Sequence, residues 1–198
     1  QHCLKKLAGK MPAPHQPQGN DSMHLPIPAL SRLIVTGKDR VKYLHNFCTN
    51  NIKELLSGNA CEAFFCDVKA RVIAHGYVLA FDDCHEIWML AGDEAGILKH
   101  LNRYIITEDV TILSATESTT VIAAIGAMSA QTLLSNAAEG RDDLKQPLQC
   151  SRLQIRTPDD KESTGTALSL DWADTPMLWL ATTTRAGDGS AAPDVISA

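Results

Sequence analysis

The sequence has no long hydrophobic run and no excess of basic residues. No apolar stretch approaches the roughly 18 residues that a membrane-spanning helix needs, so we expect no membrane partner. The 198 residues carry a formal net charge of −5, opposite in sign to the basic face that nucleic-acid binding requires. The N-terminus is too polar and too rich in proline for a secretory signal peptide. We therefore expect a cytoplasmic protein, or a mitochondrial one in a eukaryote, without nucleic-acid partners.

The motifs of several common enzyme classes are also missing. The sequence contains no Walker-type phosphate loop, no G-x-G-x-x-G fingerprint and no G-x-S-x-G elbow. Its six cysteines include no C-x-x-C pair, and the spacing of Cys61 and Cys66 suits a metal site poorly. Because several cysteines lie in apolar runs, we expect buried, reduced thiols, with no disulfide framework and no metal centre.

The overall composition is ordinary for a globular chain, with 44% hydrophobic and 21% charged residues. Residues 1–26 are expected to form a flexible N-terminal arm, because they lack periodicity and contain few apolar residues. Residues 27–184 are expected to form the folded domain, and residues 185–198, rich in glycine and serine, a flexible tail. Because the chain begins with Gln1 instead of methionine, we expect a trimmed or partial chain.

The spacing of apolar residues predicts a mixture of strands and helices. Strands are expected at 32–36, 60–66, 72–81, 86–91, 110–113, 120–125, 151–156, 167–170 and 177–182. Helices are expected at 39–48, 52–56, 93–104 and 129–138, and polar loops at 140–149 and 158–165. Strands and helices do not alternate regularly, so the pattern predicts an α+β fold with a mostly antiparallel sheet flanked by helices.

One long segment has a more specific pattern. Residues 37–55 read G-K-D-R-V-K-Y-L-H-N-F-C-T-N-N-I-K-E-L, followed by Gly58, an apolar strand at 60–66 and the hairpin D-V-K-A-R at 67–71. This order resembles the folate-binding domain of the glycine cleavage system T-protein (aminomethyltransferase) superfamily, over roughly residues 30–135. The hairpin is most similar to the folate-binding branch linked to iron–sulfur cluster assembly, where it often reads D-x-K-G-R.

The resemblance implies a tetrahydrofolate pocket in the middle of the chain. A pterin ring needs apolar or aromatic walls with a few polar groups at its edge, and its glutamate tail needs cations. Leu44 matches an apolar helix position that covers the ring in the family, and Trp88 matches an aromatic position that flanks the cofactor. Asn51, Lys69 and Arg71 complete the implied cofactor-binding set. Leu44 and Trp88 also fit an ordinary hydrophobic core equally well.

The sequence departs from the family at the catalytic position. In T-proteins the strand after the hairpin carries two aspartates, and the second is the catalytic carboxylate. Aligned without a gap from Gly37, these positions are Ala74 and His75. A histidine exchanges protons near neutral pH but repels a cation when it is protonated. The resemblance therefore implies an aminomethyltransferase-like fold in which His75 replaces the catalytic aspartate.

Three functional hypotheses follow. The first is a tetrahydrofolate-binding protein in iron–sulfur enzyme maintenance or one-carbon metabolism, whose partners are a folate-type small molecule and an iron–sulfur protein. The second is an aminomethyltransferase of glycine cleavage, which acts on a lipoyl carrier. The third is a non-catalytic interaction domain. The family normally runs well beyond 198 residues, so we expect either a fragment or a chain without the family's C-terminal part.

Overall fold

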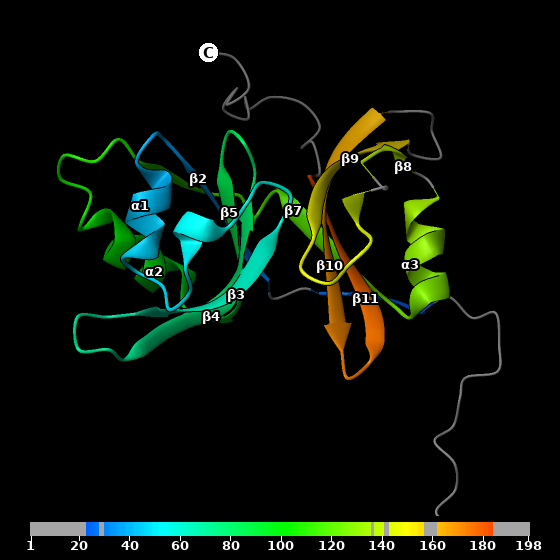
Figure 1. Ribbon diagram of the computed structural model, residues 1–198, viewed down its shortest axis with the longest axis horizontal. Helices are drawn as coiled ribbons and strands as arrows, with labels where there is room; N and C mark the ends of the chain where they lie inside the picture. Colours follow the sequence, from blue (N-terminus) through cyan, green and yellow to red (C-terminus); the bar gives the residue numbers. More distant parts are fainter. Residues whose placement is uncertain (1–22, 28–29, 136, 141–142, 157–161, 184–198) are drawn as a thin grey trace, which may run out of the picture.

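The computed structural model describes residues 23–27, 30–135, 137–140, 143–156 and 162–183. Within these ranges the chain forms two antiparallel sheets with helices on their outer sides (Figure 1). The helices are α1 (Arg40–His45), the 3₁₀ turn η1 (Ile52–Glu54), α2 (Glu94–Asn102) and α3 (Ala127–Leu134). Helices α1 and α2 lie outside one sheet and α3 lies outside the other, so the molecule has four layers (Figure 1).

The five-stranded sheet has the order β3-β4-β5-β2-β6. Its strands are β2 (Ser31–Thr36), β3 (Ala60–Cys66), β4 (Val72–Ala80), β5 (His85–Gly92) and β6 (Thr111–Ser114). Strands β3, β4 and β5 are consecutive antiparallel neighbours, as predicted. The order of elements from β2 to β6 also confirms the predicted succession of strand, two helical segments, three strands, helix and strand. The predicted α+β class with mostly antiparallel sheets is also confirmed.

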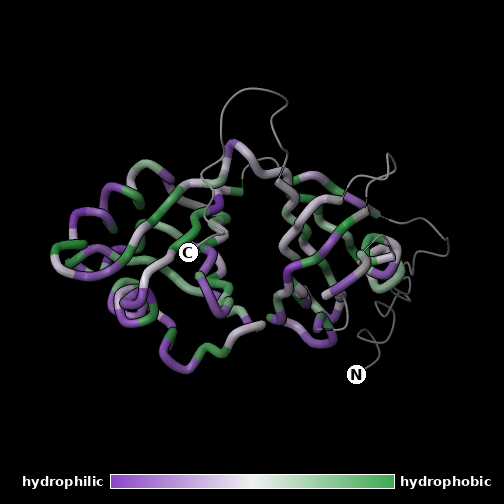
Figure 2. The backbone as a smooth tube through the Cα atoms, turned by 90° about the horizontal axis from the view of Figure 1, so that it is seen from above, coloured by the Kyte–Doolittle hydropathy of each residue, from purple (hydrophilic) through white to green (hydrophobic). Residues whose placement is uncertain are grey.

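The six-stranded sheet has the order β1-β7-β11-β10-β9-β8. Its strands are β1 (Met23–Pro26), β7 (Thr119–Ile125), β8 (Ala137–Glu139), β9 (Cys150–Arg156), β10 (Glu162–Trp172) and β11 (Thr175–Thr183). Figure 2 shows the two sheets from above as two halves of the molecule that face each other. No helix among the described residues is long and apolar enough to cross a membrane.

Three elements differ most from the sequence prediction. Strand β1 lies inside the expected flexible arm, because its backbone pairs with the edge of β7 although its side chains are all exposed. The helix expected at 129–138 ends at Leu134, and β8 follows as an edge strand beside β9. Strand β10 begins at Glu162, within the expected loop at 158–165. Residues 1–22 of the expected arm and the whole expected tail lie outside the described residues.

The strands bury side chains on both faces of the five-stranded sheet. On β5, Ile87 and Met89 pack toward the α1 and α2 side, whereas Trp88 packs toward the six-stranded sheet. This alternation follows from the two-residue repeat of a strand. A third cluster lies between the six-stranded sheet and α3. Apolar residues on both faces explain why the central strands look continuously hydrophobic in the sequence.

The cysteines of the described residues are all free thiols. Cys61, Cys84 and Cys150 are buried, and Cys48 and Cys66 are half-buried. Burial raises the pKa of Cys61 to about 11 and that of Cys150 to about 12. Because the thiolate is the reactive form, these two thiols are poor nucleophiles at neutral pH. Among the described residues, no group of three or more histidine, cysteine or acidic side chains could hold a metal ion.

His85 should make the protein sensitive to acid. The residue is 3% exposed, and neither ring nitrogen has a hydrogen-bond partner among the described residues. Burial, assisted by the charge of Arg40, lowers the His85 pKa from 6.5 to about 4. Above pH 6.5 the ring is neutral in both the folded and unfolded states, and stability is full. Between pH 6.5 and 4 the unfolded state takes up the proton first, so folding loses about 3 kcal/mol.

Urea denaturation at a series of pH values measures this loss. The matched variant is His85→Leu, which keeps an apolar side chain in the site and removes the titrating ring. Its stability should fall less between pH 6.5 and 4 than that of the wild type. Parallel curves for the two proteins would show that His85 does not contribute to the acid sensitivity.

Candidate functional site

An aromatic and charged cluster lies on the exposed part of the β3–β4 hairpin, which extends away from the six-stranded sheet (Figure 1). Glu62 and Phe64 are two residues apart on β3 and share its exposed face. Phe64 is directly opposite His75 on β4. The rings of Phe64 and His75 stack with centroids 4.6 Å apart and an interplanar angle of 22°. His75 Nε2 lies 2.6 Å from Glu62 Oε1. Phe64 is 42% exposed, so the stack is open to a ligand.

The neighbouring backbone fixes the position of His75. A β-carbon added to Gly76 would lie 2.1 Å from the carbonyl oxygen of Trp88, so only glycine fits at this point of the sheet. The pairing of β4 with β5 shifts register between His75 and Gly76. Such irregularities often redirect a side chain at the edge of a sheet.

The tip of the same hairpin carries the two predicted cationic residues. Asp67 accepts hydrogen bonds from the backbone of Lys69 at 2.8 Å and from the backbone of Arg71 at 3.0 Å. The Arg71 side chain also donates to Asp67, with Nε 2.8 Å from Oδ2. These bonds, led by that from the Arg71 backbone, lower the Asp67 pKa to about 2. Ala70 has φ = 58°, a conformation that glycine adopts more easily and that the family's usual hairpin glycine would suit.

The structure separates the other predicted cofactor residues. Leu44 and Trp88 are both 0% exposed, and they lie in different cores on opposite faces of the five-stranded sheet. Asn51 is exposed, and its backbone N–H donates a hydrogen bond to the Asn50 side chain at 2.7 Å. Only Lys69, Arg71 and His75 therefore lie on one hairpin. The cofactor-binding roles of the five predicted residues and the catalytic role of His75 stay predictions.

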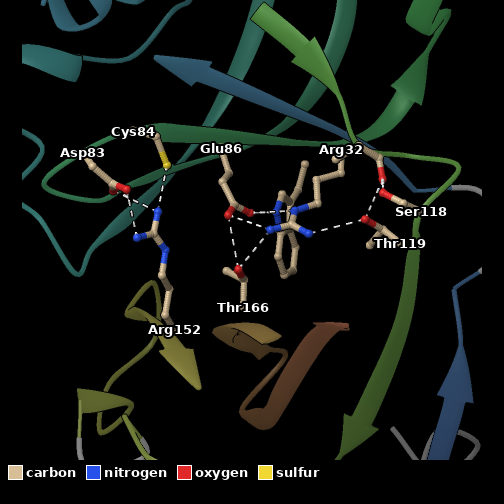
Figure 3. Close-up of polar contacts among 10 residues, drawn as sticks. Arg32, Asp83, Cys84, Glu86, Ser118, Thr119, Arg152 and Thr166 are labelled. Atoms are coloured by element: carbon tan, nitrogen blue, oxygen red, sulfur yellow. Dashed lines mark hydrogen bonds and ion pairs between the residues drawn. The ribbon is translucent and has the colours of Figure 1, made fainter. Parts of the chain in front are cut away.

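A buried polar cluster connects the two sheets (Figure 3). Arg32 on β2 and Glu86 on β5 form a bidentate ion pair, with Nη2–Oε1 at 2.7 Å and Nε–Oε2 at 2.9 Å. Arg32 Nη2 also donates to Thr166 of the six-stranded sheet at 3.1 Å, and Nη1 donates to Thr119 at 3.3 Å. Trp88 Nε1 donates to Glu86 Oε2 at 2.8 Å. The sequence prediction missed this cluster, although a lone charge in each of two apolar strands was a signal for it.

A second polar group lies beside it (Figure 3). Arg152 makes two hydrogen bonds to Asp83, at 3.0 and 2.8 Å, and one to Cys84 Sγ at 3.1 Å. Its guanidinium also lies over the Phe81 ring, 4.8 Å from the centroid. These bonds and the charge of Arg152 lower the pKa of Asp83 in spite of the opposing effect of burial. The group borders an open groove of about 860 Å³ at this end of the sheets.

A smaller pocket of about 260 Å³ lies between α1 and the segment that follows α2. Its lining includes the aromatic residues Tyr43, Phe47 and Tyr104 and the acidic residues Asp39 and Glu108. None of the six residues predicted from the sequence lines this pocket or the larger groove.

The arrangement of strands and helices is the fold seen in an aminomethyltransferase T-protein. The chain superposes on the glycine cleavage system aminomethyltransferase T of Bartonella henselae with a TM-score of 0.65 and 12% sequence identity. The match covers 81% of this chain and 41% of that one. A heterotetrameric sarcosine oxidase of Corynebacterium sp. U-96 matches with a TM-score of 0.50 and 10% identity, over 81% of this chain and 75% of that one. Identities this low show a shared fold alone.

At the level of sequence, the chain is similar to an Arabidopsis thaliana protein named "putative transferase, chloroplastic". The two are 32% identical over 107 residues, which are 52% of this chain and 24% of that protein. No protein-family model matches the sequence. The chain thus spans about a quarter of the length of this relative and less than half of the aminomethyltransferase.

Proposed function

We propose that this chain binds tetrahydrofolate on the open face of the β3–β4 hairpin. The observation that carries the proposal is the Phe64–His75 stack, which lies on the same hairpin as two cations in a chain with the T-protein fold. The same fold occurs in an enzyme named as an aminomethyltransferase of glycine cleavage, and the sequence relative is named as a transferase.

The hairpin offers the three kinds of contact that a folate needs. The exposed Phe64 ring can stack on a flat pterin, a contact worth about 0.5–1.5 kcal/mol beyond buried area. The Glu62 carboxylate is 52% exposed and can accept hydrogen bonds from the ring edge. Lys69 and Arg71 at the tip can pair with the glutamate tail. Leu44 and Trp88 could contact the ligand directly only if a packed core opened. Because the face is open, we expect weak affinity.

The cellular role belongs to the same proposal. The hairpin D-V-K-A-R at 67–71 favours the iron–sulfur maintenance branch, with an iron–sulfur protein as partner, over the glycine cleavage branch with its lipoyl carrier. A role in one-carbon metabolism is the alternative within the same ligand class. The cytoplasmic or mitochondrial location also stays a prediction, since the Arabidopsis relative is named as chloroplastic.

Calorimetric titration with tetrahydrofolate tests the proposal. The wild type should bind, and Phe64→Ala should weaken binding by roughly 3- to 10-fold through the lost ring contact. A Lys69→Ala/Arg71→Ala double variant should weaken binding of tetrahydrofolate more than binding of a pterin without a glutamate tail. The matched control is Lys53→Ala, which removes an exposed cation away from the hairpin. Absence of binding by the wild type, or equal affinity in Phe64→Ala, would refute the proposed site.

A further inference from the structure

Glu62 and His75 have a geometry that folate binding alone does not require. The two side chains come from neighbouring strands and meet at 2.6 Å, while the Phe64 ring supports the imidazole from one side. We propose that they form a carboxylate–imidazole pair in which His75 Nδ1 takes an acidic proton from a flat molecule bound on this face. Glu62 is the positioning residue of the pair, and His75 is the proton acceptor.

The chemistry of the contact determines which ring nitrogen carries the proton. An ionised carboxylate can only accept hydrogen bonds, so the Nε2 atom that faces Glu62 must be the donor. In the neutral imidazole the other nitrogen, Nδ1, then has a free lone pair. Among the described residues, no protein group makes a hydrogen bond to Nδ1. The lone pair is therefore available to a ligand, and the His75 side chain is 26% exposed.

The surroundings hold this arrangement in place. The parallel stack on Phe64, with planes 22° apart, limits rotation of the imidazole. The close contact at Gly76 fixes the backbone next to His75. A base that is held in one tautomer and one orientation loses less freedom when it meets its substrate, and this is the basis of efficient general-base catalysis.

The proton transfer balances within the pair and its ligand. The X–H bond of the ligand breaks, the electron pair stays on X, and Nδ1 forms a new N–H bond. The imidazole becomes an imidazolium, whose positive charge is stabilised by the carboxylate at Nε2. The same division of roles, with a carboxylate that orients and stabilises a histidine base, occurs in hydrolase triads. Water can later remove the proton and restore the neutral ring.

The Glu62–His75 pair lies on the same surface as the proposed folate site, but it does not require folate as its ligand. The pair can be observed without any ligand, and its basicity can be measured with an unrelated flat probe. Failure of folate binding with an intact pair would therefore refute the proposed function alone.

The first test is nitrogen-15 NMR of the histidine rings of the full chain at pH 8. His75 should show a proton on Nε2 that exchanges slowly with water, and an Nδ1 resonance typical of a nitrogen without a proton. In Glu62→Gln the amide group can donate to Nε2, so the population should shift toward a proton on Nδ1. A wild-type His75 with its proton on Nδ1, or an identical tautomer ratio in Glu62→Gln, would overturn the inference.

The second test uses 5-nitrobenzisoxazole, a flat compound whose ring opens when a base removes its C–H proton. The C–H electron pair becomes part of a nitrile, the N–O bond breaks, and the phenolate that leaves is coloured. His75→Ala should slow the protein-dependent reaction by about 100-fold, the lower end of general-base effects. Glu62→Gln should slow it by at least about 10-fold, because it favours the wrong tautomer. Glu117→Gln removes the same charge at an exposed site and should react like the wild type. Equal rates in the wild type and His75→Ala would refute the base.

Discussion

Replacing Glu86 by alanine is expected to lower the free energy of unfolding by about 3–5 kcal/mol. The change leaves the Arg32 side chain, which is 8% exposed, without its carboxylate between the two sheets. It also removes the acceptor of the Trp88 indole nitrogen and one partner of the Thr166 hydroxyl. A loss of this size is a large part of the 5–15 kcal/mol by which a typical domain is stable. Urea denaturation measures it.

Two variants show whether the cost comes from the buried charge. Asp83→Ala breaks the ion pair with Arg152, whose side chains are 59% and 42% exposed, and should cost less than about 1 kcal/mol. The double variant Arg32→Met/Glu86→Leu removes both buried charges and should recover much of the loss of Glu86→Ala. Equal costs for Glu86→Ala and Asp83→Ala would show that the inter-sheet cluster contributes no more than a surface ion pair.

The second large effect concerns the aminomethyl transfer itself. We expect no measurable formation of methylene-tetrahydrofolate from an aminomethylated lipoyl carrier, even if folate binds. The resemblance in sequence aligns Ala74 and His75 with the two aspartates of T-proteins. Loss of one group that stabilises a developing charge commonly costs about 100- to 1,000-fold in rate. Glu62 places a carboxylate nearby, but its contact with His75 at 2.6 Å already engages that charge.

A full-length aminomethyltransferase T assayed under the same conditions is the positive control. Turnover by this chain at about 1 per second or more is a rate typical of working enzymes. It would contradict the expectation that His75, in place of an aspartate, prevents the transfer. It would also favour the aminomethyltransferase hypothesis over folate binding alone.

The order of strands and helices in the first half of the described chain could be predicted because it depends on local patterns. The hairpins between β3, β4 and β5 are short, so adjacent segments pair with each other. The boundary after α3 could not be predicted, because the segment at 137–139 is held by pairing with β9 and not by its own propensity. Strand β1 could not be predicted for the same reason, because it forms by pairing with the edge of β7. Met23 pairs with Ile125, which is about 100 positions away in the sequence.

The candidate site was predictable only in part. The family pattern pointed to Lys69, Arg71 and His75, which do lie on one hairpin. The contact between His75 and Glu62, which are 13 positions apart, depends on the register in which β3 and β4 pair. The sequence did not indicate this register. Trp88 matched an aromatic position of the family, yet its ring is 0% exposed and its nitrogen is bonded to Glu86. A residue type at a matching position does not reveal which face of a strand it occupies.

The most direct test of the proposed function is the position of tetrahydrofolate on the protein. NMR titration of the uniformly labelled chain with tetrahydrofolate should change the resonances of Phe64, His75 and Lys69, with changes that saturate together as one binding event. Resonances around the aromatic pocket of Tyr43 and Phe47 should stay unchanged. Changes confined to that pocket, or no saturable change at all, would contradict a folate site on the β3–β4 hairpin.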